Sequence, residues 1–524
     1  MFLTTKKKPK PRRPAAAAPD TSSNKSAPKK AATSPREDRG TWRDLTGPRP
    51  RGLRRWKLLD RLGWYEPPHE YVLTTSTRQV VPLVPAVVAA YQREFLGRPL
   101  GLDDVTGQLV TSDPFQLYAA GLATSVNVLI AGDVGTAKST LCKDHYVTGQ
   151  LDLGRRVCTF DRKRQHRHGE TSMGEYGRAA EVARTAGYTV AEMSFTNEAN
   201  GARVNILDPA ILTKTDRGSG LVGQDRLLRL AAELARGPLS SKERWVLKVA
   251  HRVALRNAAE QGRVPILSDV IEALFTITRD DASPHERLVE AELVTDETVL
   301  EWGMTLAMDL SQSDLLQLFD GETCDADGQP LNLDADLLVI DTSDLGEGSA
   351  QQVMLMAVMT TFVASVWATD ERASLVIIEE GYSADLPTAG QVLRSLSKRG
   401  RGLGLGLVFV VHHLSDIPPD SPLRALIKEI GVIHIFRQQT EEDATDVLRT
   451  FGLPVSAEEL MRLQKGTHLL REGSDGKHPV RHVAHLQTAL DRWVTYTDDN
   501  LRPGGGPPNS LETEMAPAPL AQPE

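Results

Sequence analysis

The sequence predicts an α/β fold with a mainly parallel central sheet and an inserted all-α subdomain. Short apolar runs rich in β-branched residues recur along the chain. Each run is nearly continuous, as in parallel strands that are covered on both faces. Helical patterns such as 178–185 and 351–367 lie between several of the runs, which is the element order of α/β proteins. The predicted strands are 126–130, 156–160, 190–195, 337–340, 375–378, 407–411 and 432–436.

The stretch 221–318 has a different pattern, with helical periodicity and few strand candidates. Ser240 and Glu243 have the spacing of a capping box at the start of a helix. Val249 and Val253 then fall on one face of that helix. We therefore expect a helical subdomain inserted into the α/β domain.

The composition of the chain excludes several classes of protein. The chain has 524 residues, of which 40% are hydrophobic and 25% charged, so it can bury a sizeable core and form more than one structural unit. A net charge of −8 argues against a protein that coats DNA over its whole surface. Three cysteines predict a reducing compartment and no disulfide framework. The apolar run 353–367 is interrupted by Thr and Ser, and no secretory signal is found, so a cytoplasmic protein is expected.

The two ends of the chain have the composition of disordered segments. Residues 1–55 are rich in Lys, Arg, Pro, Ala and Ser, with too few large apolar groups to offset the entropy of ordering. This basic arm could attract DNA or an anionic membrane surface, or it could be a solvated tail. Residues 499–524 are dominated by Pro, Gly and Ala and form a second predicted tail.

The sharpest motif is a glycine-bearing segment between a predicted strand and a predicted helix. It consists of Gly132, Asp133, Val134, Gly135, Thr136, Ala137, Lys138 and Ser139, and the predicted helix starts at Thr140. These residues, Thr140 included, are the candidate nucleotide-binding residues. This is the pattern of a P-loop, in which backbone N–H groups surround the phosphates of a nucleotide. Lys138 would reach the β and γ phosphates, and the hydroxyl of Ser139 would bind Mg²⁺.

Ala137 departs from the usual P-loop pattern, which has glycine before the lysine. Alanine adds a single methyl group, and we expect it to fit at the start of a helix. The alternative is a chance turn that binds no nucleotide.

A P-loop enzyme also needs carboxylates at the end of a neighbouring strand. The predicted strand 375–378 ends in Glu379 and Glu380. Glu379 would support the metal ion, and Glu380 would orient the attacking water. The alternative is a strand that ends in two solvated acids.

The strand that follows ends in His412 and His413. Many P-loop motors carry a polar side chain there that senses the γ phosphate, and His412 could do this. A metal pair is a weaker interpretation, because adjacent strand residues point to opposite faces. His166 and His168 lack an evident third ligand.

The loop before that strand contains Arg399 and Arg401 among several glycines. One of them could act on the nucleotide of a neighbouring subunit as an arginine finger. The alternative is a solvated turn, and the pattern does not favour either arginine.

In combination these segments resemble the conjugative type IV secretion ATPases of the HerA–FtsK superfamily. The resemblance covers about 113–498 and rests on ordered matches at 113–115, Gly121, 127–130, 174–176, Gly187, 204–209, 378–380, 397–400 and 415–416. It implies a RecA-like P-loop NTPase that binds ATP and Mg²⁺, assembles as a homo-hexamer and contacts type IV secretion channel components. The family usually has Gly, Asp and Gln where Ala137, Glu379 and His412 stand. The resemblance implies a short form of the actinobacterial type, in which most of the usual N-terminal domain is expected to be lacking.

The expected domain organisation follows from these motifs. A small N-terminal region at 56–116 precedes a RecA-like ATPase domain in two parts, 117–220 and 331–498, separated by the helical insertion at 221–330. The leading function is an ATPase motor that energises a conjugation-type secretion channel, with peripheral membrane association. The alternatives are a DNA-translocating ATPase of the coupling-protein or FtsK kind, and a nucleotide-binding scaffold with little hydrolysis.

Overall fold

The computed structural model describes most of the chain beyond its first part. The described residues are 96–162, 164–165, 173–196, 201–212, 222–282, 295–368, 372–379, 389–390, 392–394, 396–397, 402, 404–418, 421–473 and 480–495. All of them belong to the second of the two units into which the chain divides, Tyr71–Glu524. Several features discussed from the sequence lie outside the described residues. They are the arm 1–55, the tail 499–524, His166, His168, Glu380, Arg399 and Arg401.

A single large sheet of eleven strands forms the centre of the described chain. Its parallel part contains, in spatial order, β11 (Val432–Phe436), β3 (Val128–Ala131), β10 (Leu405–Val411), β9 (Ser374–Glu379), β4 (Arg156–Asp161), β8 (Leu337–Asp341) and β7 (Val190–Ser194). Each of the seven predicted strands is present within a few residues of its expected bounds. The predicted α/β fold with a mainly parallel sheet is confirmed.

Beyond β11 the sheet continues with antiparallel strands. These are β12 (Thr467–Glu472), β13 (Arg481–His485), β1 (Arg98–Asp103) and β2 (Leu109–Ser112). The described part of the expected small N-terminal region is therefore joined to the main sheet, since Gly101 in β1 pairs with His485 in β13. No local pattern in the sequence indicates a pairing between segments so far apart.

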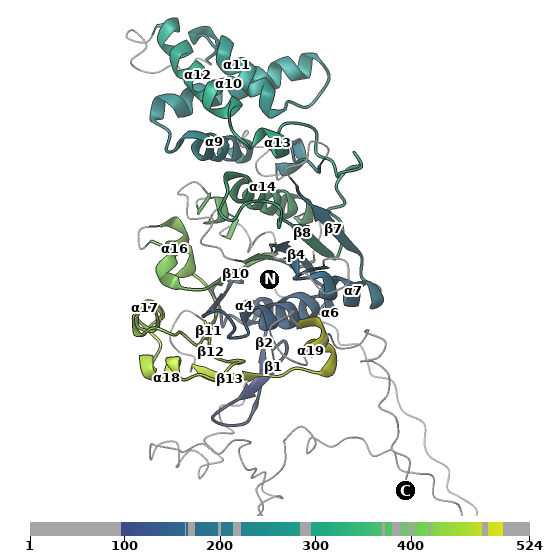
Figure 1. Ribbon diagram of the computed structural model, residues 1–524, viewed down its shortest axis with the longest axis vertical. Coiled ribbons are helices and arrows are strands. Elements are labelled where there is room, and N and C mark those ends of the chain that lie inside the picture. Colours follow the sequence, from purple (N-terminus) through teal and green to yellow (C-terminus); the bar gives the residue numbers. More distant parts are fainter. Residues whose placement is uncertain are drawn as a thin grey trace, which may run out of the picture. The chain divides into compact units, whose positions relative to one another are not determined.

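Helices cover both faces of the parallel strands. Val128 and Ile130 of β3 face a cluster with α7 (Gly177–Thr185) and α19 (Ala489–Thr495). Leu129 and Ala131 face the opposite cluster, which includes α14. Figure 1 shows α14 on one side of the sheet and α4, α6 and α7 on the other. Burial on both faces explains why these strands are continuous apolar runs.

Helix α14 (Ala350–Trp367) is the most apolar helix of the described chain. By length and composition it could cross a membrane, but 83% of it is buried inside the protein. It contacts β9 and the first helix of the insertion. Its apolar character is therefore accounted for by its position in the core.

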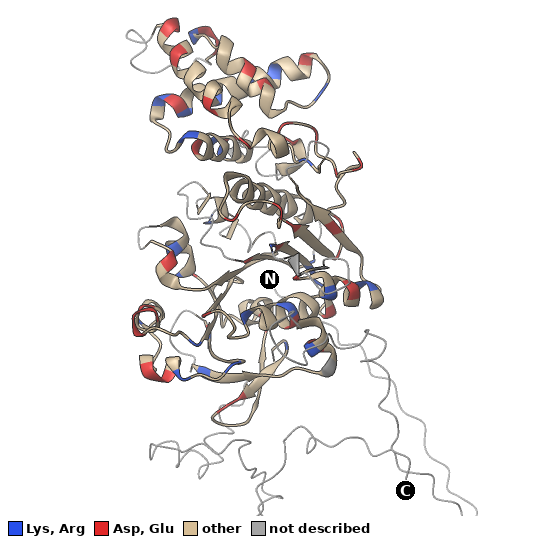
Figure 2. Ribbon diagram, viewed as in Figure 1, with Lys and Arg blue, Asp and Glu red and all other residues tan. Residues whose placement is uncertain are grey.

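The insertion between β7 and β8 is helical, as predicted. It contains η4 (Pro209–Ile211), α9 (Val222–Arg236), α10 (Ser241–Glu260), α11 (Leu267–Thr276), η5 (Arg279–Asp281), α12 (Asp296–Ser311) and α13 (Leu316–Phe319). The predicted capping box is present, because the amide of Glu243 donates to Oγ of Ser240 at 3.3 Å and the amide of Ser240 donates to Glu243 at 2.7 Å. Figure 2 shows acidic and basic residues interspersed over these helices.

The remaining elements are short. They are α4 (Pro114–Ala119), α5 (Lys138–Leu141), η3 (Cys142–Thr148), α6 (Gly149–Asp152), β5 (Arg164–Gln165), β6 (Met173–Gly174), η7 (Leu414–Asp416), α16 (Pro422–Ile427), α17 (Glu441–Phe451) and α18 (Ala457–Met461).

Candidate nucleotide-binding site

The glycine-bearing loop connects β3 to α5 at the carboxyl end of the sheet. A Cβ atom at Gly132 would lie 2.5 Å from the Cβ of Phe436 on the neighbouring strand, so no larger residue fits there. Gly135 has a φ of 77°, which glycine adopts without strain. The loop therefore needs both glycines for its path, as a P-loop does.

Ala137 corrects one expectation from the sequence. It does not have helical dihedral angles but lies in the left-handed region, with φ 86° and ψ 25°, directly before α5. Among the residues that the structure describes, it is the one non-glycine with positive φ. A side chain in this region costs about 1–2 kcal/mol. This conformation explains why glycine is common at this position in P-loops.

The helix after the loop begins at Lys138, two residues before the predicted start at Thr140. It continues as the π-helical segment η3, which runs into α6. Ser139 and Thr140 thus lie in the first turn, directly after the loop. π-Helical turns are often found at functional sites.

Lys138 contacts the loop and the end of β10. Its ammonium donates to the carbonyl oxygens of Gly132 and Asp133, the latter at 2.8 Å. Its Nζ also lies 3.0 Å from Nδ1 of His412. The structure therefore brings together Lys138 and His412, the predicted phosphate-binding lysine and the predicted sensor.

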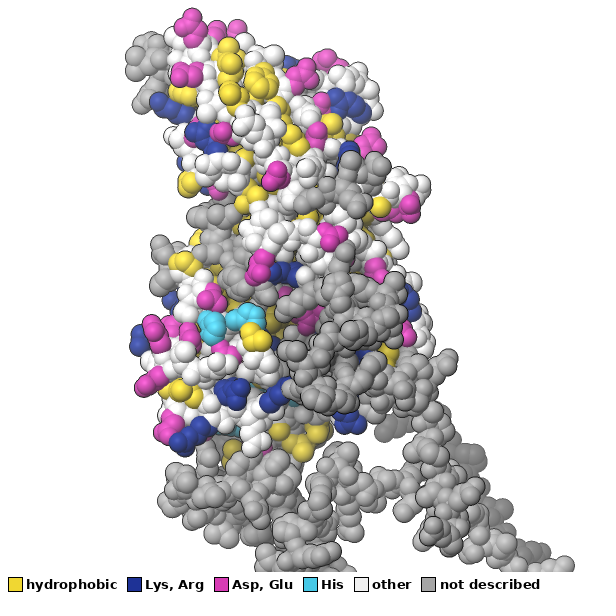
Figure 3. Space-filling model, in the orientation of Figure 1, with side chains coloured by type: hydrophobic (Ala, Val, Ile, Leu, Met, Phe, Trp, Pro, Cys, Tyr) yellow, Lys and Arg dark blue, Asp and Glu magenta, His cyan; other side chains and the backbone are white. Residues whose placement is uncertain are grey.

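His413 also lies at the loop, although opposite faces were expected for the two histidines. The β10 strand ends at Val411, so strand alternation no longer applies to them. Nδ1 of His413 is 3.3 Å from Oδ1 of Asp133 and 3.4 Å from Oδ2 of Asp443 at the start of α17. Figure 3 shows histidine side chains on this face, beside α17.

Asp443 belongs to the acidic first turn of α17, which is visible in Figure 2. Burial raises the pKa of Asp443, but hydrogen bonds from Thr440 and Ser415 and the charge of His413 outweigh this effect. The pKa therefore lies below its ordinary value. Asp443 is thus held as an anion beside His413.

Glu379 ends β9 at the same edge of the sheet as the loop. In register, Glu379 lies opposite Val410 of β10, and the next residue, Val411, lies opposite Ala131 of β3. The Glu379 residue is only 7% exposed. Its carboxylate accepts a hydrogen bond from the hydroxyl of Tyr176. The hydroxyl of Ser139 and the carboxylate of Glu379 are hard oxygen groups of the kind that Mg²⁺ prefers.

The segment Gly174–Tyr176 contacts both the end of β4 and the helical segment that follows the loop. A Cβ atom at Gly174 would lie 2.2 Å from Oδ2 of Asp161 at the end of β4. The amide of Tyr176 donates to the same oxygen at 2.9 Å. Nζ of Lys143 forms an ion pair with Glu175 at 3.2 Å, and both side chains are buried. This segment thus connects the ends of β4 and β9 with the helix that follows the loop.

No sequence motif assigns a chemical role to Lys143, Glu175 or Tyr176. Glu175 and Tyr176 lie in the segment 174–176, whose resemblance to the family implies no function for them. Burial, followed by the charges of Cys142 and Glu379, raises the pKa of Tyr176 well above its ordinary value. The hydroxyl therefore keeps its proton and is the donor to Glu379.

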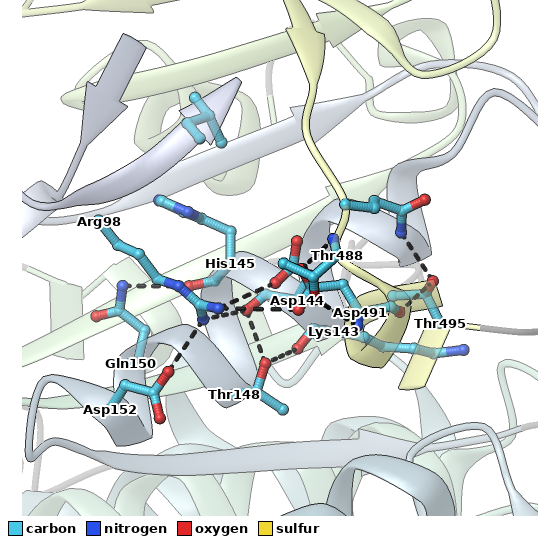
Figure 4. Close-up of polar contacts among 12 residues, drawn as sticks. Arg98, Lys143, Asp144, His145, Thr148, Gln150, Asp152, Thr488, Asp491 and Thr495 are labelled. Carbon is cyan, nitrogen blue, oxygen red and sulfur yellow. Dashed lines mark hydrogen bonds and ion pairs between the residues drawn. The ribbon is translucent and has the colours of Figure 1, made fainter. Parts of the chain in front are cut away.

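A polar cluster around Asp144 connects η3 with both ends of the described chain (Figure 4). Arg98 of β1 lies 3.7 Å from Asp144, 3.4 Å from Asp152 and 3.8 Å from Asp491 of α19. Nε2 of His485 lies 2.8 Å from Asp144. Burial and the charge of Asp491 raise the pKa of Asp144, while His485 and Arg98 oppose the rise. These contacts connect the antiparallel strands β1 and β13 with η3, the helical segment that follows α5.

The parallel sheet with a glycine-bearing loop and lysine after β3 places the protein in the P-loop NTPase class. A family model for an AAA-like domain matches residues 120–477, so the chain belongs to this family. None of the curated proteins matches the chain.

Among solved structures, the chain is similar to VirB4 of Thermoanaerobacter pseudethanolicus. The identity is 18% and the TM-score 0.56, covering 76% of this chain and 99% of that chain. It is also similar to the bacterial conjugative coupling protein TrwB in its unbound form, with 14% identity, a TM-score of 0.45, and coverage of 80% and 93%. The likeness to VirB4 confirms, at the level of fold, the resemblance seen in the sequence.

Proposed function

We propose that the chain is an ATP-hydrolysing motor that energises a conjugation-type, or type IV, secretion or DNA-transfer apparatus. One observation carries the proposal: Lys138 of the loop contacts His412 at the end of β10, beside the strand that ends in Glu379. Membership of the AAA-like family and the VirB4-like fold support the same conclusion.

The described side chains have distinct roles in this proposal. The loop 132–137 and Lys138 bind the phosphates of ATP, with Lys138 exchanging its carbonyl contacts for phosphate oxygens. Ser139 and Glu379 hold Mg²⁺, which offsets phosphate charge when it is bound. Because the Lys138 ammonium can only donate, Nδ1 of His412 accepts. His412 therefore keeps an N–H at Nε2 that can donate to the terminal phosphate.

Three residues outside the described part complete the proposed site. Glu380 directly follows Glu379 in the sequence and orients the attacking water. Arg399 or Arg401 reaches the nucleotide of a neighbouring copy and stabilises charge on the transferred phosphoryl group. Such a contact requires an adjacent subunit, and we propose that the subunits form a homo-hexameric ring.

The partners follow from the same proposal. The ring acts at the cytoplasmic face of the membrane, with peripheral association, and contacts the components of the secretion channel. The basic arm 1–55 supplies positive charge for contact with DNA.

Steady-state ATP hydrolysis, measured against protein concentration, tests the proposal. We expect turnover that rises cooperatively with concentration and is lost in Glu380→Gln. The assay is repeated with single- and double-stranded DNA. Strong stimulation by DNA that weakens with salt would instead favour a DNA-translocating motor. Nucleotide binding without turnover at every concentration would contradict the proposal and indicate a scaffold.

A further inference from the structure

The hydroxyl of Tyr176 donates a hydrogen bond to Oε1 of Glu379. Tyr176 is fully buried and Glu379 is 7% exposed, so water competes little for this contact. We infer that Tyr176 is a positioning residue that orients the carboxylate of Glu379 for Mg²⁺ binding. This inference rests on the proposed function, because it concerns the metal side of the same nucleotide site.

Tyr176 is itself held in a fixed position. Its amide donates to Oδ2 of Asp161 at 2.9 Å, and Gly174 allows that carboxylate to approach the backbone. The neighbouring Glu175 pairs with the buried Lys143. The backbone that carries the phenol is therefore fixed by contacts on both sides, and the ring itself is fully buried.

A fixed donor matters more for a glutamate than it would for an aspartate. Glutamate has one more rotatable bond, so its carboxylate can adopt more orientations. The hydrogen bond from Tyr176 occupies Oε1 and selects one of these orientations. Groups that bond to a metal ligand in this way typically change metal affinity by 10- to 100-fold.

The same hydroxyl also contacts the helix that follows the loop. Sγ of Cys142 lies 3.6 Å from the hydroxyl oxygen of Tyr176, and Cys142 is the first residue of η3. Tyr176 therefore touches the segments that carry both metal-binding side chains, since Ser139 lies one turn before Cys142 and Glu379 ends β9. Tyr176 can therefore fix the positions of these two segments relative to each other.

The test is a calorimetric titration of a non-hydrolysable ATP analogue into the full chain, once with excess Mg²⁺ and once with EDTA. The gain in affinity due to Mg²⁺ is the quantity compared. In Tyr176→Phe we expect this gain to fall about 10-fold or more, with affinity in EDTA unchanged. The matched control is Tyr146→Phe, because Tyr146 is also fully buried but its hydroxyl bonds to Nε2 of His434 at 2.6 Å. This control should keep the full gain.

A second variant tests the inference without removing the phenol. Glu379→Asp shortens the side chain and withdraws the carboxylate from Tyr176, so the gain due to Mg²⁺ should also fall. If Tyr176 acts through Glu379, the double variant should lose no more than Glu379→Asp alone.

Two results would overturn the inference while leaving the proposed function intact. One is an equal gain in Tyr176→Phe and in the wild type, and the other is full additivity of the two substitutions. An equal loss of affinity with and without Mg²⁺ is a case of the first result and would indicate a general structural role of Tyr176. Absence of Mg²⁺-dependent binding in the wild type would overturn the proposed function, and this inference with it.

Discussion

The Nζ atom of Lys138 lies 3.0 Å from Nδ1 of His412. An ammonium group has donors and no acceptor, so this nitrogen of His412 accepts and carries no proton. The ring N–H that can donate is then at Nε2. The residue that follows β10 thus contacts the predicted phosphate-binding lysine and has one N–H to donate.

The first prediction concerns this N–H. His412→Gln should retain turnover within about tenfold, because the amide group can both accept and donate. His412→Ala should lower kcat roughly 100-fold, the usual effect of removing one donor to developing charge. Nucleotide affinity should change little in either variant. An alanine variant that turns over ATP as fast as the wild type would exclude His412 from the reaction.

The second prediction concerns Ala137. Because its φ is 86°, Ala137→Gly should relieve backbone strain and raise the free energy of unfolding by about 1 kcal/mol. Urea unfolding measures this change. Ala186→Gly is the matched control, since Ala186 has a φ of −76° at the end of a helix, and glycine there should lower stability. Destabilisation by Ala137→Gly would show that the left-handed conformation is not the one in solution.

The third prediction concerns the buried pair of Lys143 and Glu175, which are 3.2 Å apart. Lys143→Met should destabilise the protein by about 3–5 kcal/mol, because the Glu175 carboxylate is left buried without this cation. The double variant Lys143→Met with Glu175→Gln should recover a large part of the loss. Chemical unfolding of the three proteins provides the comparison, and additive losses would argue against the pair.

The fourth prediction concerns stability in acid. Burial lowers the pKa of His434 and His468 well below the ordinary value, and that of His145 to about 3. Below about pH 6.5 the unfolded chain therefore binds more protons than the folded protein, and stability falls as the pH decreases. For His145 the loss continues down to about pH 3. Above about pH 6.5 these histidines are neutral in both states and contribute no pH dependence.

His468→Leu isolates one of these groups. Neither ring nitrogen of His468 has a hydrogen-bond partner within the described part of the chain, so leucine removes the titration without breaking a hydrogen bond. The slope of unfolding free energy against pH should decrease by up to about 1.4 kcal/mol per pH unit in acid. Near neutral pH the two slopes should coincide. Identical slopes in acid would mean that His468 titrates normally.

The fold could be predicted where burial leaves a local signal. The strands 128–131 and 405–411 are buried along their whole length, and this burial produces the apolar runs seen in the sequence. The strand Arg481–His485 has one buried residue among partly exposed ones, so it lacks such a run. Strand β1 also lacks a continuous buried run. Its pairing with β13 joins segments that are far apart in the sequence, so no local pattern indicates it.

Parts of the candidate site could be predicted because their residues directly follow strands that the sequence indicates. Lys138, Glu379 and His412 follow predicted strands, and the carboxyl ends of parallel strands meet at one edge of the sheet. The contact between Tyr176 and Glu379 joins residues 203 positions apart, and neither local pattern indicates it. Lys143 could not be recognised as buried, because lysine is rarely buried without a partner and no local pattern indicates its ion pair with Glu175.

Nucleotide binding by the wild type and by Lys138→Ala tests the central claim most directly. The account predicts that a non-hydrolysable ATP analogue with Mg²⁺ binds the wild type, and that Lys138→Ala binds it about 10- to 100-fold more weakly, because a charged hydrogen bond to phosphate is lost. Lys242→Ala is the control, since its ammonium lies 5.0 Å from the ring centroid of Trp302 in the helical insertion, and it should bind as the wild type does. Equal affinity of the wild type and Lys138→Ala would contradict the account.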